Sequence, residues 1–185
     1  MKDLTDIREI ENIQHLNNEY DLQKALLLHR KLRLMTENNP DLIPIRKRLF
    51  NLIHDYESIH WSDSEKITDT QFEESEIAEI LVESERKFIQ KRKETIINRL
   101  KMFDMNQQDL GILLEHRKSY MSEIINGVLK FSLKDLIIVH RVLGIELSKL
   151  IPTYLHNETR KRVEESINRL NKPKLKFKKE DLMMV

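Results

Sequence analysis

The sequence contains no cysteine, and only three glycines and four prolines among its 185 residues. Without cysteine the chain forms no disulfide, no thiolate metal site and no thiol nucleophile. The scarcity of glycine disfavours tight β-hairpins, which depend on residues with positive φ. No stretch approaches the roughly 20 apolar residues of a membrane-spanning helix. The charged first residues, MKDLTDIREIE, also lack the apolar segment of a secretory signal. These absences favour an all-α protein of the cytoplasm that does not enter a membrane.

Charge and catalytic motifs narrow the function further. The 32 Lys and Arg nearly balance the 31 Asp and Glu, so only the distribution of charge can indicate a nucleic-acid partner. The sequence has no glycine-rich phosphate loop, no HExxH zinc motif and no G-x-S-x-G nucleophile motif. The seven histidines are scattered, and the spacing of His54 and His60 puts them on different faces of a helix. The sequence therefore indicates no enzyme, no metal and no cofactor.

Residues 1–61 are predicted to form an N-terminal helical hairpin or bundle. Leucines at helical spacing mark one helix over Glu19–Met35. Pro40 ends it, because the residue before a proline is pushed out of the helical conformation. A second helix begins near Pro44, a residue type suited to the first helical turn. The short connection implies antiparallel neighbours, and residues 2–16 are the candidate for a third helix. We expect part of this leucine-rich surface to bind a second copy of the chain or a partner protein.

The charge pattern divides the rest of the chain. Residues 62–85 contain many acidic side chains and a single lysine, and are interpreted as an acidic linker that becomes helical after Phe72. The sign then reverses from Arg86 onward. Such a block is either a solvated helix face or an electrostatic lead-in to a nucleic-acid-binding unit. Residues 86–152 are predicted to form a domain of five short helices. Residues 153–185 are interpreted as a charged tail, disordered except for a candidate helix over Thr159–Leu170.

Within residues 86–152, the stretch from Asn106 to Gly127 predicts two short helices joined by a tight turn. Asn106 suits a helix N-cap, and Gly127 can take the left-handed conformation that follows a helix. Residues 115–117 interrupt the apolar period and mark the turn. The apolar residues expected in the core are Leu110, Leu113, Leu114, Met121, Ile124 and Ile125. The polar residues on the other face of the second helix are Lys118, Ser119, Ser122 and Glu123. A helix that enters the major groove of DNA has this division of faces.

Two sets of residues carry a resemblance to known families. Gln107, Asp109-Leu110, Ser122-Glu123-Ile124 and Asn126-Gly127 resemble the Q-x-D-L and S-E-x-x-N-G positions of the lambda-repressor-like (Xre) helix-turn-helix family. Tyr56-Glu57 with His60 resembles the Y-E-x-x-H segment that precedes the helix-turn-helix in HigA-type antitoxins. The resemblance covers roughly residues 10–152.

The resemblance implies an antitoxin that binds palindromic operator DNA as a homodimer and holds a small ribonuclease toxin of HigB type. The residues implied to contact DNA are Gln107, Arg117, Lys118, Ser119, Ser122, Glu123 and Asn126. The resemblance implies that Lys118, Ser119 and Glu123 reach base edges. Gln107 would touch a phosphate or brace the recognition helix, and Asn126 would touch the DNA backbone. Lysine pairs with the acceptors of guanine, and glutamate accepts from cytosine N4.

Three residues depart from the family pattern. Glu115 stands where a turn glycine is usual, Arg117 replaces a Ser or Thr cap, and Gly111 replaces an alanine. A glutamate at the turn requires backbone strain or another turn geometry. Two alternatives therefore stay beside the antitoxin interpretation. One is a stand-alone Xre-type repressor without a toxin partner. The other is a protein-interaction module that has lost DNA binding.

Overall fold

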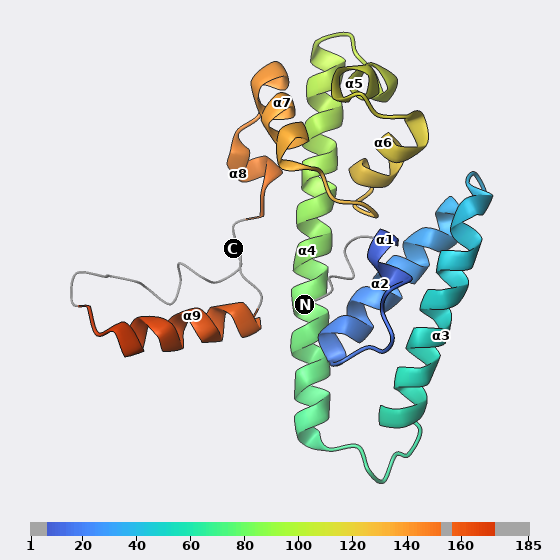
Figure 1. Cartoon of the computed structure of the whole chain (residues 1–185), viewed down its shortest axis with the longest axis vertical. Helices are drawn as coiled ribbons and strands as arrows, with labels where there is room; N and C mark the ends of the chain where they lie inside the picture. The colour runs from blue at the N-terminus through green and yellow to red at the C-terminus, as the bar shows by residue number, and fades with distance from the viewer. Residues whose placement is uncertain (1–6, 153–156, 173–185) are drawn as a thin grey trace.

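The computed structural model describes residues 7–152 and 157–172. All regular secondary structure in these residues is helical, which confirms the all-α class. No helix within the described ranges combines the length and the apolar composition needed to cross a membrane. A long central helix runs through the molecule, and α2 (Glu19–Met35), α5 (Gln107–Leu114), α7 (Leu133–Leu143) and α8 (Leu147–Leu150) pack against it (Figure 1).

The N-terminal region contains α1 (Ile7–Ile10), α2 (Glu19–Met35) and α3 (Ile43–His60). The side chain of Asn18 caps α2 by accepting a hydrogen bond from the backbone of Asp21, and α2 has the predicted bounds. A single 3-10 turn, Pro40–Leu42, leads into α3, which lies alongside α2 (Figure 1). The prediction of a third helix over residues 2–16 is wrong beyond Ile10, and residues 2–6 of it lie outside the described residues. Ile13 and Leu16 are buried without helical structure, because the surrounding helices supply the packing.

The central helix α4 spans Asp69–Met102 and crosses the boundary predicted between residues 85 and 86. The side chain of Thr68 caps its start by accepting from the backbone of Gln71. No glycine or proline occurs between its ends, so nothing in the sequence breaks the helix where the charge changes sign. The boundary predicted between residues 85 and 86 therefore lies inside α4, and the connection between α3 and α4 is limited to residues 61–68.

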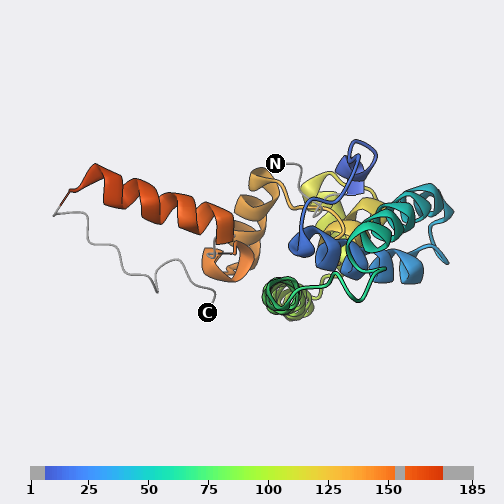
Figure 2. The same cartoon turned by 90° about the horizontal axis from the view of Figure 1, so that it is seen from below.

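Four short helices surround the C-terminal part of α4: α5 (Gln107–Leu114), α6 (Lys118–Ile125), α7 (Leu133–Leu143) and α8 (Leu147–Leu150). Figure 2 looks along α4 and shows that α9 (Asn157–Leu170) extends away from these elements. Asn106 and Asp109 form a capping box at the start of α5, as Ser132 and Asp135 do at the start of α7. Such caps satisfy backbone donors that a helix start leaves free, so each short helix begins at a defined residue.

Polar pairs buried inside the core join the N-terminal helices to each other and to α4. Lys24 of α2 and Glu85 of α4 form an ion pair of 3.3 Å, with only 7% of each side chain exposed. The hydroxyl of Tyr20 donates to the same glutamate. Within the N-terminal region, the hydroxyl of Tyr56 donates to Glu19 Oε1 at 3.0 Å. Tyr56, which is part of the resemblance to HigA-type antitoxins, thus has a structural role in joining α3 to α2.

Candidate nucleic-acid interface

The turn between α5 and α6 depends on Glu115 and Gly111. Glu115 adopts a left-handed conformation with φ of 60°. The backbone amide of His116 then donates to the carbonyl of Gly111 at 2.8 Å. A Cβ added at Gly111 would lie 3.0 Å from both the His116 carbonyl oxygen and the Met121 Cγ. The glycine therefore allows the turn and α6 to approach α5 closely, at the expense of helix propensity.

A histidine that the sequence analysis did not single out fixes the turn to α7. His116 Nε2 lies 3.1 Å from the Asp135 carboxylate, which is almost fully buried. The ring of His116 also packs against Tyr120, with centroids 4.5 Å apart. Asp135 lies nineteen residues further along the chain, so spacing in the sequence carried no signal of this contact. The turn is therefore held to α5 by the hydrogen bond from His116 to Gly111 and to α7 by the contact of His116 with Asp135.

The apolar face of α6 agrees with the prediction. Met121, Ile124 and Ile125 are buried, and Gly127 has a φ of 68°. A Cβ at Gly127 would lie 2.6 Å from the side chain of Ile89 on α4, so the absence of a side chain matters there as well as the backbone angle. Leu113, expected in the core, is instead 40% exposed. The core needs only Leu110 and Leu114 from α5 because that helix packs through one narrow face.

The N-terminal half of α6 is open to solvent. Arg117, Lys118 and Ser119 are exposed, and their side chains make no hydrogen bond or ion pair with any other residue that the structure describes. A shallow depression of about 470 Å3 lies between the start of α5 and α6. Its polar lining consists of Asn106, Gln107, Gln108, Lys118 and Ser122. The structure therefore brings Gln107, Lys118 and Ser122 together, although they belong to two helices.

The C-terminal half of α6 contacts the N-terminal region. Asn39 Nδ2, in the connection between α2 and α3, donates to Glu123 Oε1 at 3.2 Å. Lys31 of α2 donates to the carbonyl of Asn126 at 3.2 Å, and Lys93 of α4 donates to its Oδ1 at 2.8 Å. The predicted DNA contacts therefore fall into two groups. Five of the residues border the solvent, whereas Glu123 and Asn126 are engaged by side chains of the protein itself.

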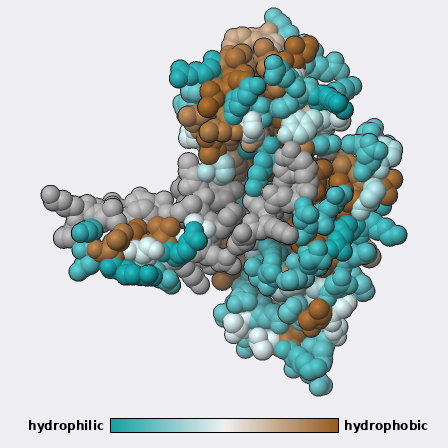
Figure 3. Space-filling model, viewed as in Figure 1, coloured by the Kyte–Doolittle hydropathy of each residue, from teal (hydrophilic) through white to brown (hydrophobic). Residues whose placement is uncertain are grey.

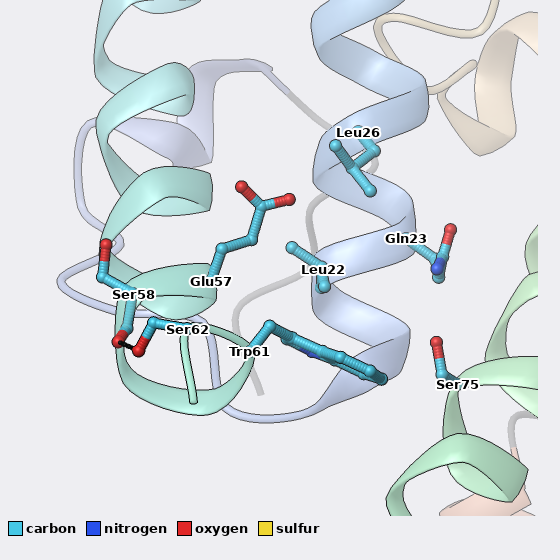
Figure 4. Close-up of a pocket in the computed structure, with 8 residues that line it drawn as sticks. All are labelled: Leu22, Gln23, Leu26, Glu57, Ser58, Trp61, Ser62 and Ser75. Atoms are coloured by element: carbon cyan, nitrogen blue, oxygen red, sulfur yellow. Dashed lines mark hydrogen bonds between the residues drawn. The ribbon is translucent and has the colours of Figure 1, made fainter. Parts of the chain in front are cut away.

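A second hollow lies toward the N-terminal end of α2, away from α6. It measures about 600 Å3 and is walled by Leu22, Leu26 and Trp61 (Figure 4). Its polar residues include Glu57 and Ser58, and the Ser62 hydroxyl donates to the Ser58 carbonyl at 2.7 Å. No histidine or cysteine is among its lining residues. Nor do the described residues contain a group of three or more His, Asp or Glu placed to hold a metal ion.

Comparison of the chain with protein families, with curated protein sequences and with solved structures found no match.

Proposed function

We propose that α6 reads double-stranded operator DNA and that the protein is the antitoxin and autorepressor of a type II toxin–antitoxin pair. In this proposal, α5 and α6 are the helix-turn-helix of a lambda-repressor-like domain formed by the C-terminal part of α4 together with α5–α8. The observation that carries it is the exposed, partner-free start of α6 beside the depression that contains Gln107 and Ser122. A recognition helix uses residues near its N-terminus to contact base edges.

The chemistry of these side chains suits the two kinds of DNA contact. Lys118 is an exposed ammonium group that can donate to guanine O6 and N7 in the major groove. Arg117 precedes α6 and makes no capping hydrogen bond, which leaves its guanidinium available to a phosphate. Gln107 opens α5 and borders the same depression, where a phosphate of the neighbouring strand would lie. The proposed site thus combines base recognition with backbone positioning.

The antitoxin part of the proposal rests on the resemblance around Tyr56 and on charge. The first half of α4 exposes an acidic surface to solvent. Its exposed acidic residues include Asp69, Glu73, Glu74, Glu76 and Glu79. A small ribonuclease toxin is expected to be basic because it binds RNA, so opposite charge would favour its association with this surface. We therefore propose the N-terminal half of α4 as part of the toxin-binding surface.

The contacts of Glu123 and Asn126 favour a second candidate function. Both residues contact the N-terminal region, so the C-terminal half of α6 is not free to enter a major groove unless those contacts open. A protein-interaction module that retains the architecture but has lost DNA binding would have this property. The two functions differ in one measurable respect, which is the affinity for promoter DNA.

Gel-shift titration with a fragment of the protein's own promoter tests the DNA-binding proposal. Lys118→Ala should weaken specific binding about tenfold or more, because a good base contact contributes about 1–3 kcal/mol. Arg117→Ala should weaken binding to all sequences about equally and flatten the salt dependence. Lys47→Ala, which removes an exposed cation from α3, is the control and should bind like the wild type. If neither α6 variant alters the affinity, the DNA-binding proposal fails and the interaction module is favoured.

We also propose that the protein binds DNA as a homodimer, since one recognition helix covers too few base pairs for specific affinity. The N-terminal helices remain one candidate surface, because they expose Leu34, Phe50 and Ile59 although most of their leucines are buried within the chain. Figure 3 shows exposed apolar atoms gathered over the upper end of the molecule, around α5 and α7. Exposed apolar residues of these elements include Ile112 and Leu133. Light scattering should give twice the mass of one chain, and a monomer that binds a palindrome tightly would contradict this proposal.

A further inference from the structure

A groove of about 500 Å3 lies between α2 and α4, at the point where α6 ends. Four cationic side chains line it: Arg30 and Lys31 from α2, and Arg86 and Lys93 from α4. Apolar side chains, including Leu27, Leu34 and Ile89, form the rest of its wall. Among the described residues no Asp or Glu lines this groove. It is therefore an electropositive site with an apolar wall, distinct from the exposed start of α6.

The positive charge of the groove is not neutralised nearby. Arg86 is matched by Glu83, whose carboxylate lies 2.6 Å from the guanidinium. Arg30, Lys31 and Lys93, in contrast, form no ion pair with any carboxylate in the described part of the chain. The nearest buried carboxylate, Glu85, is already held by Lys24 at 3.3 Å. Three cations therefore remain without an anionic partner.

The state of Lys31 reflects this environment. Its pKa is lowered from the ordinary 10.5 to about 8, first by burial and then by the neighbouring Arg86, Arg92 and Lys24, while Glu85 opposes them. A partly buried lysine next to other cations is stabilised by a bound anion, which supplies the missing opposite charge.

The two lysines also converge on one point. Lys31 donates to the carbonyl of Asn126, and Lys93 donates to its side-chain oxygen. Both ammonium groups are therefore hydrogen-bonded to a neutral residue at the end of α6. The amide of Asn126 in turn donates to the carbonyl of Ser122 at 2.8 Å. An anion that draws the lysines away from Asn126 would therefore release the end of α6.

We propose that this groove binds a phosphate-bearing small molecule of the nucleotide class, with its phosphates at Arg30, Lys31 and Lys93 and its base or sugar against the apolar wall. A polyphosphate carries several charges on a compact group, whereas one carboxylate would neutralise only one of the three cations. The volume falls within the about 300–1,000 Å3 that is typical of small-molecule sites. Binding at this position is coupled to α6 through Asn126.

Isothermal titration calorimetry of the full chain with ATP, inorganic pyrophosphate and adenosine tests the proposal. ATP should bind more tightly than pyrophosphate, which lacks the apolar part, and more tightly than adenosine, which lacks the charge. At pH 8 about half of the Lys31 side chains are uncharged. ATP binding should therefore take up protons at pH 8 and not at pH 6.5, which is measured by comparing two buffers of different ionisation enthalpy.

Matched variants identify the groups that carry the binding. Lys31→Met and Lys93→Met retain the apolar stem of the side chain and should each weaken ATP binding about tenfold, the effect of one charge-assisted hydrogen bond. Lys31→Met should also abolish the proton uptake. Lys47→Met on α3 is the control and should leave both readouts unchanged. Circular dichroism melts verify folding, and Arg30→Gln, at an exposed position, provides a third test if a lysine variant unfolds.

Two results would overturn the proposal. One is the absence of binding by both ATP and pyrophosphate at millimolar concentration. The other is equal ATP affinity of the wild type and of the variants that fold. A parallel titration with duplex DNA distinguishes a nucleotide phosphate from a DNA phosphate. If Lys31→Met weakens DNA binding and ATP does not bind, the groove contacts the DNA backbone instead. The calorimetric result does not require DNA binding, so failure of the proposed function leaves it intact.

Discussion

At the scale of single residues, Glu115 and Gly111 decide the geometry of the turn between α5 and α6. Glu115 takes the left-handed conformation that glycine adopts without steric cost, and its carboxylate makes only an exposed pair with Lys134 at 3.3 Å. Gly111 leaves the space in which the His116 carbonyl and the Met121 side chain lie. The left-handed position of the turn is therefore occupied by a glutamate, while a glycine is required four residues earlier.

Replacing Glu115 by glycine should stabilise the protein. Relief of the left-handed strain exceeds the added entropy of the unfolded chain, and we expect a gain of about 0.5–1 kcal/mol in the free energy of unfolding. Urea denaturation followed by circular dichroism measures it. Glu115→Ala removes the same carboxylate but retains the Cβ, so this control should show no gain. Equal stability of the two variants would mean that the turn is not strained.

Lys31 makes the stability depend on pH in the alkaline range. Its pKa is about 8 in the folded protein and 10.5 without the surrounding structure, so between these values the unfolded chain binds more protons. The free energy of unfolding should therefore increase as the pH rises from about 8 to 10.5. Below pH 8 the buried ammonium group is charged, and the folded state is destabilised by the full cost of burying that charge. Urea denaturation at pH 7 and pH 10 should show a smaller alkaline gain for Lys31→Met than for the wild type. Identical pH profiles would contradict the burial of this charge.

At the scale of elements, α4 determines how the molecule is organised. Its N-terminal part packs against α2, and its C-terminal part packs against α5, α7 and α8 (Figure 1). The buried pair of Lys24 and Glu85 lies in the contact between α2 and α4. A buried ion pair contributes little net stability but becomes costly when one partner is removed, because the remaining charge is left without compensation.

Lys24→Met should therefore destabilise the protein by about 3–5 kcal/mol, since it leaves the Glu85 carboxylate buried without its cation. The double variant Lys24→Met with Glu85→Gln should recover much of this loss, because the neutral amide oxygen still accepts from the Tyr20 hydroxyl. Chemical denaturation of the two single variants, the double variant and the wild type forms a complete cycle. Additive effects of the two substitutions would show that the pair is not coupled.

At the scale of the whole molecule, the N-terminal helices and the helices around α6 share one core. The buried residues form a continuous cluster that includes Leu32 and Leu49 from the N-terminal region and Met121 and Ile124 from α6. The backbone amide of Ile7 donates to the carbonyl of Val128 at 3.3 Å, which adds a direct link between the two regions. Buried residues of the predicted N-terminal region and of the predicted five-helix domain thus belong to one cluster.

This continuity predicts a single cooperative unfolding transition. Trp61 is the only tryptophan and lies at the end of α3, so its fluorescence reports on the N-terminal region, whereas far-ultraviolet circular dichroism reports on all helices. Urea titrations followed by the two signals should have the same midpoint. Two separated midpoints would indicate that the regions unfold independently. A fragment of residues 86–152 should be less stable than the full chain, because the cut lies inside α4.

The sequence alone determined the features that depend on neighbouring residues. The bounds of α2, the N-cap of α5 at Asn106 and the left-handed Gly127 were predicted because caps, prolines and apolar periodicity act within a few positions. The buried face of α6 also followed from its period, since Met121 and Ile124 must lie on one side of a helix.

Only the tertiary structure decided which polar residues of α6 remain free. Asn39 and Glu123 are 84 positions apart, and Lys31 and Asn126 are 95 apart, so no local pattern could have connected them. The continuity of α4 across the change of charge also depends on packing. α4 has little apolar surface of its own, and α2 packs against one face of it. Ser119 and Glu123 are four positions apart and share one face of α6, and the position of the N-terminal region leaves the first exposed and engages the second.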